Sequence, residues 1–165
     1  PSSRLFSDLR EEQKLAYSVH SKLDKVYDTR AIHLIIGTTT ENKETGEVSY
    51  DNLQKSIEGF KKHIQKLKTE KVSEKELASA KLALKNELLE QNESGADKTE
   101  TLNYSLSSGY GLTRENKLLE MIDTITADDI YNAANYIFKE KPVYSIVATE
   151  NTLKANEKYL NSLSA

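Results

Sequence analysis

The chain has 165 residues, a formal net charge of -3 from 23 basic and 26 acidic residues, and no cysteine. This length is enough for one domain with its own core. The mixed charges favour neither nucleic acid nor a membrane surface as a partner, and the lack of cysteine excludes disulfides and cysteine-ligated metal. No apolar run approaches the roughly 20 residues of a membrane span, and no targeting signal is visible, so the compartment stays open.

The chain begins with a predicted helix that runs directly into a strand. Ser2 or Ser3 can cap a helix over residues 4–14, because a serine hydroxyl accepts a free backbone N–H of the first turn. Residues 15–24 then alternate as in a half-buried strand. Its apolar face is expected to carry Leu15, Tyr17, Val19 and Leu23.

The next segments predict a second strand and then several helices. Residues 31–40 are β-branched and apolar on both faces, which indicates a more central strand paired with the first as an antiparallel hairpin. Ser73 with Glu76 forms a capping-box pattern, and Thr126 opens another helix. The apolar stripe of the first long helix consists of Leu53, Ile57, Phe60, Ile64 and Leu67.

The end of the chain returns to a strand and a last helix. Residues 143–149 read as a buried strand of the same sheet, and residues 151–164 as a helix. We therefore expect an α+β fold over residues 1–165, with helices packed on one face of a small, mainly antiparallel sheet. Because the chain starts at Pro1 without a methionine, we expect it to be a fragment of a longer protein, whose upstream strand would complete the sheet.

No self-contained catalytic or metal site is apparent in the sequence. The three histidines are His20, His33 and His63; no two are four residues apart, and no H-x-x-E-H or H-E-x-x-H motif occurs. Surface or internally satisfied histidines are the simpler interpretation. Phosphate-binding glycine loops and a G-x-S-x-G nucleophile motif are also missing. The chain is therefore expected to hold no metal or other cofactor itself.

Arg10 and Tyr17 stand out because they lie seven residues apart across an abrupt helix-to-strand junction. The junction contains no Gly, Pro, Asn or Asp. The residue types alone leave two interpretations open. The pair contacts a ligand, or Arg10 forms a surface ion pair with a nearby acid and Tyr17 is an ordinary strand aromatic. The acids in question are Asp8, Glu11 and Glu12.

The sequence around this pair resembles that of the insulinase (pitrilysin-like) zinc metallopeptidases. "SSRLFSDLREEQKLAYSVHS" is similar to their pattern S-S-R-L-F-x-x-L-R-E-K-x-G-L-A-Y-S-V. Further similarities follow in the same order: "VSEKELASAKLALKNELL", "LLEMIDTITADDIYNAANYIF" and the closing "YSIVAT". The chain departs from the pattern at Lys14, where the family often has glycine, and lysine is a poor residue for a left-handed turn.

The resemblance implies that the chain is the second subdomain of a zinc-free half. In such proteases the other half carries zinc on H-x-x-E-H, and the zinc-free half contributes an arginine and a tyrosine spaced as Arg10 and Tyr17 are here. Those donors would stabilise the negative charge that develops on the carbonyl oxygen of a peptide substrate. The implied partners are therefore a peptide and a catalytic half, in the same chain or in another subunit.

Two other functions stay open. Noncatalytic members of the same fold act as scaffolds or substrate-recognition modules, and an unrelated α+β interaction domain would show the same helix and strand patterns. The parent protein is expected to be a zinc metalloendopeptidase, whereas the isolated chain is expected to be inactive. The sequence does not indicate the substrate, the compartment or the oligomeric state.

Overall fold

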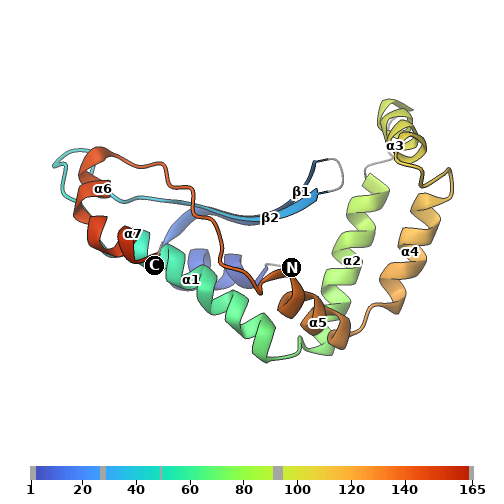
Figure 1. Cartoon of the computed structure of the whole chain (residues 1–165), viewed down its shortest axis with the longest axis horizontal. Helices are drawn as coiled ribbons and strands as arrows, with labels where there is room; N and C mark the ends of the chain where they lie inside the picture. The colour runs from blue at the N-terminus through green and yellow to red at the C-terminus, as the bar shows by residue number, and fades with distance from the viewer. Residues whose placement is uncertain (1–2, 27–28, 49, 91–94, 164–165) are drawn as a thin grey trace. The chain divides into compact units, whose positions relative to one another are not determined.

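The computed structural model describes residues 3–26, 29–48, 50–90 and 95–163 (Figure 1). The elements, in chain order, are η1 (Phe6–Glu12), β1 (Ala16–Val26), β2 (Thr29–Thr38), α1 (Tyr50–Thr69), α2 (Glu74–Glu90), α3 (Gly95–Ser107), α4 (Arg114–Thr124), α5 (Ala127–Ile137), α6 (Glu150–Ala155) and α7 (Glu157–Leu163). The fold is α+β, as the sequence predicts: it is mostly helical, with one antiparallel pair of strands.

The chain divides into two compact units. The first consists of residues 1–66 and 140–165, and the second of residues 67–139. The boundary falls inside α1. The single domain expected over residues 1–165 remains a prediction.

Strands β1 and β2 form the antiparallel hairpin expected for this part of the first unit. Leu23 pairs with Ile32 and Val19 with Ile36, and the register shifts between Ala16 and Ser18. Ala16 faces Thr38 while Ser18 faces Gly37, so two steps along β1 match one step along β2. The extra residue is Tyr17, which makes this end of the hairpin a β-bulge.

The core of the first unit lies between the hairpin and two helices on the same side of it, η1 and α1 (Figure 1). Apolar side chains from η1, the start of β1, β2 and α1 meet there: Leu5, Phe6, Leu9, Leu15, Ala16, Val19, Ile36 and Phe60. Leu9 is fully buried. It packs on the backbone of α1, because a Cβ at Gly59 would lie only 2.5 Å from the Leu9 Cδ2 atom.

Residues 143–149 form no strand, and the prediction of a third strand is wrong. Within the described part of the chain, the sheet contains β1 and β2 only, so residues 31–40 do not form a central strand either. Val143 and Val147 are 97% and 99% exposed. An apolar, β-branched pattern reports a preference for burial in a sheet, but a strand also needs a neighbouring edge to pair with.

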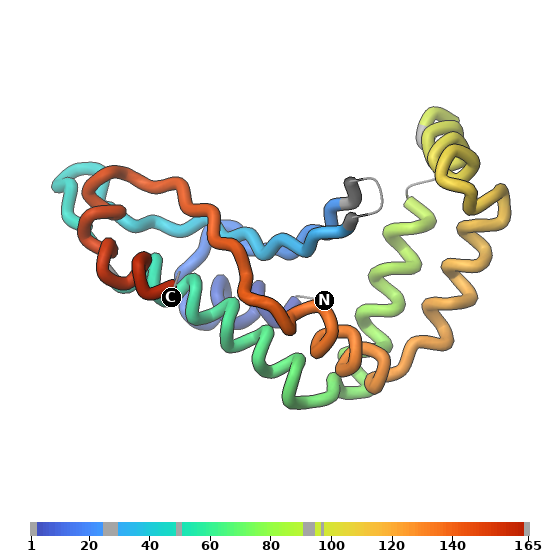
Figure 2. Tube along the Cα trace, in the orientation of Figure 1, coloured from blue at the N-terminus to red at the C-terminus, as the bar shows by residue number. Residues whose placement is uncertain are grey.

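Within the first unit, the C-terminal helices pack against the first half of α1, where Figure 2 shows them in red. The Thr149 hydroxyl caps α6, as Thr152 N–H donates to it over 3.2 Å. The Tyr159 hydroxyl donates to Glu58 of α1 over 2.7 Å. Burial, together with the Glu58 carboxylate, raises the pKa of Tyr159 above its usual range, so the phenol stays protonated and remains a donor.

The second unit is helical. The Lys85 ammonium of α2 lies 2.6 Å from the Asp123 carboxylate of α4 and thereby joins these two helices. The predicted caps are present: the Ser73 hydroxyl accepts from Glu76 N–H, and Thr126 and Asp129 form a reciprocal capping box. In the described residues of this unit and of the first, no helix is long and apolar enough to cross a membrane.

Candidate functional site

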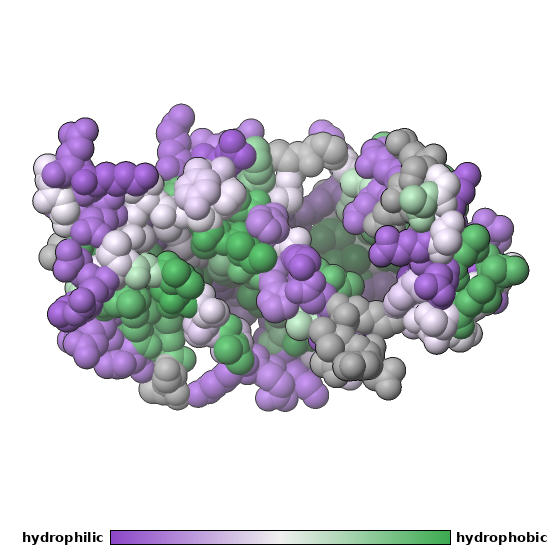
Figure 3. All heavy atoms as spheres, turned by 90° about the horizontal axis from the view of Figure 1, so that it is seen from above, coloured by the Kyte–Doolittle hydropathy of each residue, from purple (hydrophilic) through white to green (hydrophobic). Residues whose placement is uncertain are grey.

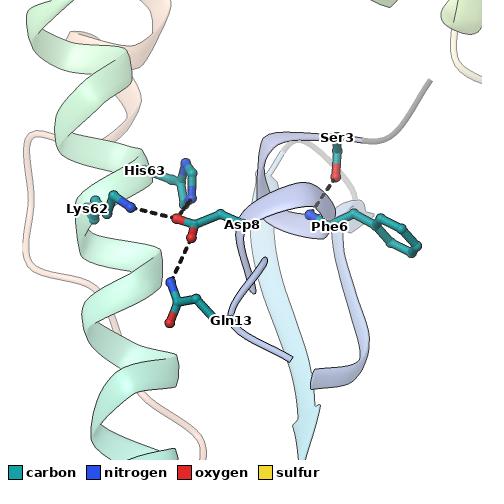
Figure 4. Close-up of polar contacts among 6 residues, drawn as sticks. All are labelled: Ser3, Phe6, Asp8, Gln13, Lys62 and His63. Carbon is teal, nitrogen blue, oxygen red and sulfur yellow. Dashed lines mark hydrogen bonds and ion pairs between the residues drawn. The ribbon is translucent and has the colours of Figure 1, made fainter. Parts of the chain in front are cut away.

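The N-terminal helix begins at the cap that the sequence predicts. Ser3 provides it, because its hydroxyl accepts from Phe6 N–H over 3.3 Å (Figure 4). The Ser3 carbonyl also accepts from Ser7 N–H over 2.9 Å. Ser2, the other candidate cap, lies outside the described residues. From Phe6 to Glu12 the helix is a π-helix, a rare form that often occurs at functional sites. Its last bond runs from Gln13 N–H to the Asp8 carbonyl over 2.9 Å.

The segment that joins η1 to β1, residues 10–17, is here called the corner segment. Lys14 has a positive φ of 52°, in the left-handed region that a glycine would occupy without strain. Leu15 N–H donates back to the Leu9 carbonyl over 2.9 Å, and the Thr38 hydroxyl donates to the Leu15 carbonyl over 2.6 Å. These bonds join the corner segment to η1 on one side and to β2 on the other.

Asp8 attaches η1 to α1 (Figure 4). Its carboxylate accepts from the Lys62 ammonium over 2.7 Å and lies 2.8 Å from His63 Nε2, and the Gln13 amide donates to its other oxygen over 2.7 Å. Hydrogen bonds from Lys62, Gln13 and His63 to the ionised form lower the pKa of Asp8 to about 2. The corner segment is therefore held by a carboxylate that stays charged.

Arg10 lies on the exposed side of η1. Its guanidinium carbon is 4.8 Å from the centre of the Phe6 ring, a cation–π distance. Within the part of the chain that the structure describes, the guanidinium forms no ion pair, and Asp8 pairs with Lys62 and His63 instead. The surface ion pair considered from the sequence is not formed with Asp8.

Tyr17 is the extra residue of the bulge and is 71% exposed. The bulge interrupts the alternation of β1, so Leu15, Ala16 and Val19 are buried while Tyr17 is not. The prediction that Tyr17 shares one face with Leu15 and Val19 is wrong for this reason. Among the described residues, the Tyr17 hydroxyl has no hydrogen-bond partner.

The surroundings of these two residues contain no metal cluster. No group of three or more His, Cys, Asp or Glu side chains that could hold a metal ion occurs among the residues with described positions. His63 Nε2 lies 2.8 Å from Asp8 while its Nδ1 is buried with no hydrogen-bond partner among the described residues, and His33 lies 3.4 Å from Asp24. The described residues therefore present no ligand set of the kind that zinc needs.

A family model described as the peptidase M16 inactive domain matches residues 1–84. The chain belongs to the M16 peptidase family. The match covers the corner segment, the hairpin and α1, so the insulinase-like resemblance inferred from the sequence is confirmed. The chain accordingly contains an inactive domain of the M16 type.

Curated relatives of this M16 chain include two proteins named uncharacterized zinc protease. The one from Rickettsia felis is 33% identical over 146 residues, which cover 88% of this chain and 33% of that protein. The one from Rickettsia bellii is 28% identical over 152 residues, covering 91% of this chain and 34% of that protein. The chain therefore spans about a third of the length of these relatives.

Sequence reasoning missed the role of Asp8 as the residue that attaches η1 to α1. Its partners Lys62 and His63 lie 54 and 55 positions away, and no local pattern links residues at that separation. The one available signal was the i to i+5 spacing of Asp8 and Gln13, which meet only because η1 is a π-helix.

Proposed function

We propose that this chain is the zinc-free part of a zinc-dependent metalloendopeptidase. In this proposal Arg10 and Tyr17 bind the peptide substrate and stabilise its transition state, while a catalytic half, in the same polypeptide or in a partner subunit, holds the metal. The observation that carries the proposal is the corner segment, where both side chains are exposed on a backbone joined to η1, β2 and α1.

The chemistry of the two side chains supports this role. Hydrolysis of a peptide bond places negative charge on the carbonyl oxygen, and preformed donors aimed at that oxygen lower the barrier. An arginine guanidinium such as that of Arg10 offers several N–H donors, and the Tyr17 hydroxyl is a donor at the end of a rigid ring. Free donors are needed for this task, and neither side chain forms an ion pair or hydrogen bond with another described residue.

The test is substitution of each residue in the intact parent protein together with its catalytic half. We expect Arg10→Ala and Tyr17→Phe each to lower kcat/KM on a fluorogenic peptide by about 10²–10³, the usual cost of one oxyanion donor. Zinc content and the circular dichroism spectrum should not change, because neither residue contributes to the core.

Matched control variants are Arg30→Ala and Tyr136→Phe. Arg30 is an exposed arginine of β2, and Tyr136 is 74% exposed, close to the value for Tyr17. Both control variants should keep wild-type kinetics. Wild-type kcat/KM in Arg10→Ala and Tyr17→Phe would instead indicate the alternative, a noncatalytic scaffold or substrate-recognition module of the same fold.

A further inference from the structure

Gly37 is a glycine inside a β-strand whose backbone does not require glycine. It lies in β2 directly opposite the bulge, where it pairs with Ser18. Its φ is not positive, unlike that of Gly46, Gly109 and Gly111. Glycine weakens a strand interior, and its presence there often marks a bulge or a close approach of another group. We therefore attribute the glycine at this position to another group that occupies the space next to its Cα atom.

The Tyr17 ring occupies that space. A Cβ atom at Gly37 would lie 2.5 Å from Tyr17 Cζ and 2.6 Å from the Tyr17 hydroxyl oxygen, closer than real Cβ atoms approach their neighbours. It would also lie 2.9 Å from the Ser18 hydroxyl oxygen. The bulge gives Tyr17 no opposite residue of its own, and its ring reaches across the strand pair onto the bare backbone of β2. Aromatic side chains are known to cover glycines of a neighbouring strand in this way.

We infer that Gly37 is a positioning residue, which holds the Tyr17 hydroxyl where the substrate is bound. This inference rests on the proposed function of Tyr17. With no hydrogen bond from the hydroxyl to another described residue, packing against Gly37 is the contact that restrains the reactive end of the ring. The hydroxyl of the neighbouring Thr38 donates a hydrogen bond to the Leu15 carbonyl, so the backbone beneath the ring is connected to the corner segment.

A side chain at position 37 would move the hydroxyl while leaving the fold intact. The atoms in its way are the far end of the exposed Tyr17 side chain and a serine hydroxyl, both of which can rotate away from a new methyl group. Displacement of a donor by about 1 Å can cost about 100-fold in rate. We therefore expect Gly37→Ala to lower kcat about 10- to 100-fold, with KM and the unfolding midpoint nearly unchanged.

The experiment is a double-mutant cycle in the intact parent protein with its catalytic half. It compares the wild type with Gly37→Ala, Tyr17→Phe and the double variant. We expect Gly37→Ala to reduce kcat/KM in the wild-type background and to cause no further loss once the Tyr17 hydroxyl is gone. Gly95→Ala is the matched control, because a Cβ there would meet nothing within 4 Å, and it should leave kcat/KM unchanged.

A second measurement, on the 165-residue chain, detects the packing of Tyr17 on Gly37 independently of catalytic activity. In proton NMR the Gly37 α-protons should be shifted upfield by the Tyr17 ring current, and Tyr17→Leu should abolish that shift. Equal losses of kcat/KM on Gly37→Ala in both backgrounds, or no upfield shift, would overturn the role of Gly37 and leave that of Tyr17 standing. Wild-type kinetics in Tyr17→Phe would overturn the proposed function and the role of Gly37 with it.

Discussion

Lys14 adopts the one non-glycine left-handed conformation among the described residues, with a φ of 52°. For residues with a Cβ atom this region costs about 1–2 kcal/mol, because the Cβ approaches the following carbonyl oxygen. The corner segment keeps Lys14 there because Leu15 N–H must reach the Leu9 carbonyl. Local strain is thus tolerated at the point where the chain leaves η1 and enters β1.

Lys14→Gly should therefore stabilise the chain. We expect the free energy of unfolding to rise by up to about 1 kcal/mol, since the relief of strain exceeds the extra entropy that glycine brings to the unfolded chain. Urea denaturation followed by circular dichroism measures this. Lys14→Ala keeps the Cβ atom and should stay within about 0.5 kcal/mol of the wild type; a glycine variant no more stable than the alanine variant would contradict the assignment of strain.

The polar contacts of Asp8 connect two elements, η1 and α1, that are distant in sequence. The Asp8 and His63 side chains are only 13% and 12% exposed, so this contact is shielded from solvent more than a surface contact would be. Leu9, the next residue, is buried against Gly59 of the same helix. A polar and an apolar contact therefore fix η1, and with it the start of the corner segment.

The lowered pKa of Asp8 predicts a pH dependence of stability. The folded pKa is about 2, below the ordinary aspartate value of 3.8, so the stabilisation is fully present above about pH 4 and is lost as the pH falls toward 2. Asp8→Asn should lower the free energy of unfolding by roughly 1–2 kcal/mol at pH 7 and by much less at pH 2. Urea unfolding across this pH range gives the measurement.

Glu11→Gln is the control for that series, because Glu11 is an exposed carboxylate on the same helix. Its variant should change stability by less than about 0.5 kcal/mol at either pH. An Asp8→Asn variant whose loss of stability is the same at pH 7 and pH 2 would show that packing of the side chain, and not its charge, attaches η1 to α1.

Across the whole molecule, the inactive M16 domain leads us to expect a chain that depends on another half for its metal. The part of the chain with described positions holds no group of three metal-ligating side chains, and zinc sites need three or four. After dialysis, elemental analysis should find far less than one zinc per isolated chain, whereas the intact parent should retain zinc. One tightly held zinc in the isolated chain would contradict this.

Much of the fold followed from local patterns. Ser3, Ser73 and Thr126 cap helices because their hydroxyls lie within a few positions of the N–H groups that they accept. The hairpin of β1 and β2 followed from two adjacent apolar runs. The prediction of a strand at residues 143–149 was wrong because the pattern indicates apolar character alone. Pairing also requires a free edge of a neighbouring strand, which no local sequence specifies.

The sequence by itself determined most of the helices, the hairpin, the family and the candidate pair Arg10 and Tyr17, because each depends on residues close together in the chain or on a contiguous motif. The single helix expected over residues 151–164 is instead two helices, α6 and α7. Only the tertiary structure decided how Arg10 and Tyr17 are presented. The bulge that exposes Tyr17, the glycine beneath its ring and the carboxylate that holds η1 on α1 all join residues at least 19 positions apart. Contacts at that range arise from packing and register, which no local pattern of hydrophobicity encodes.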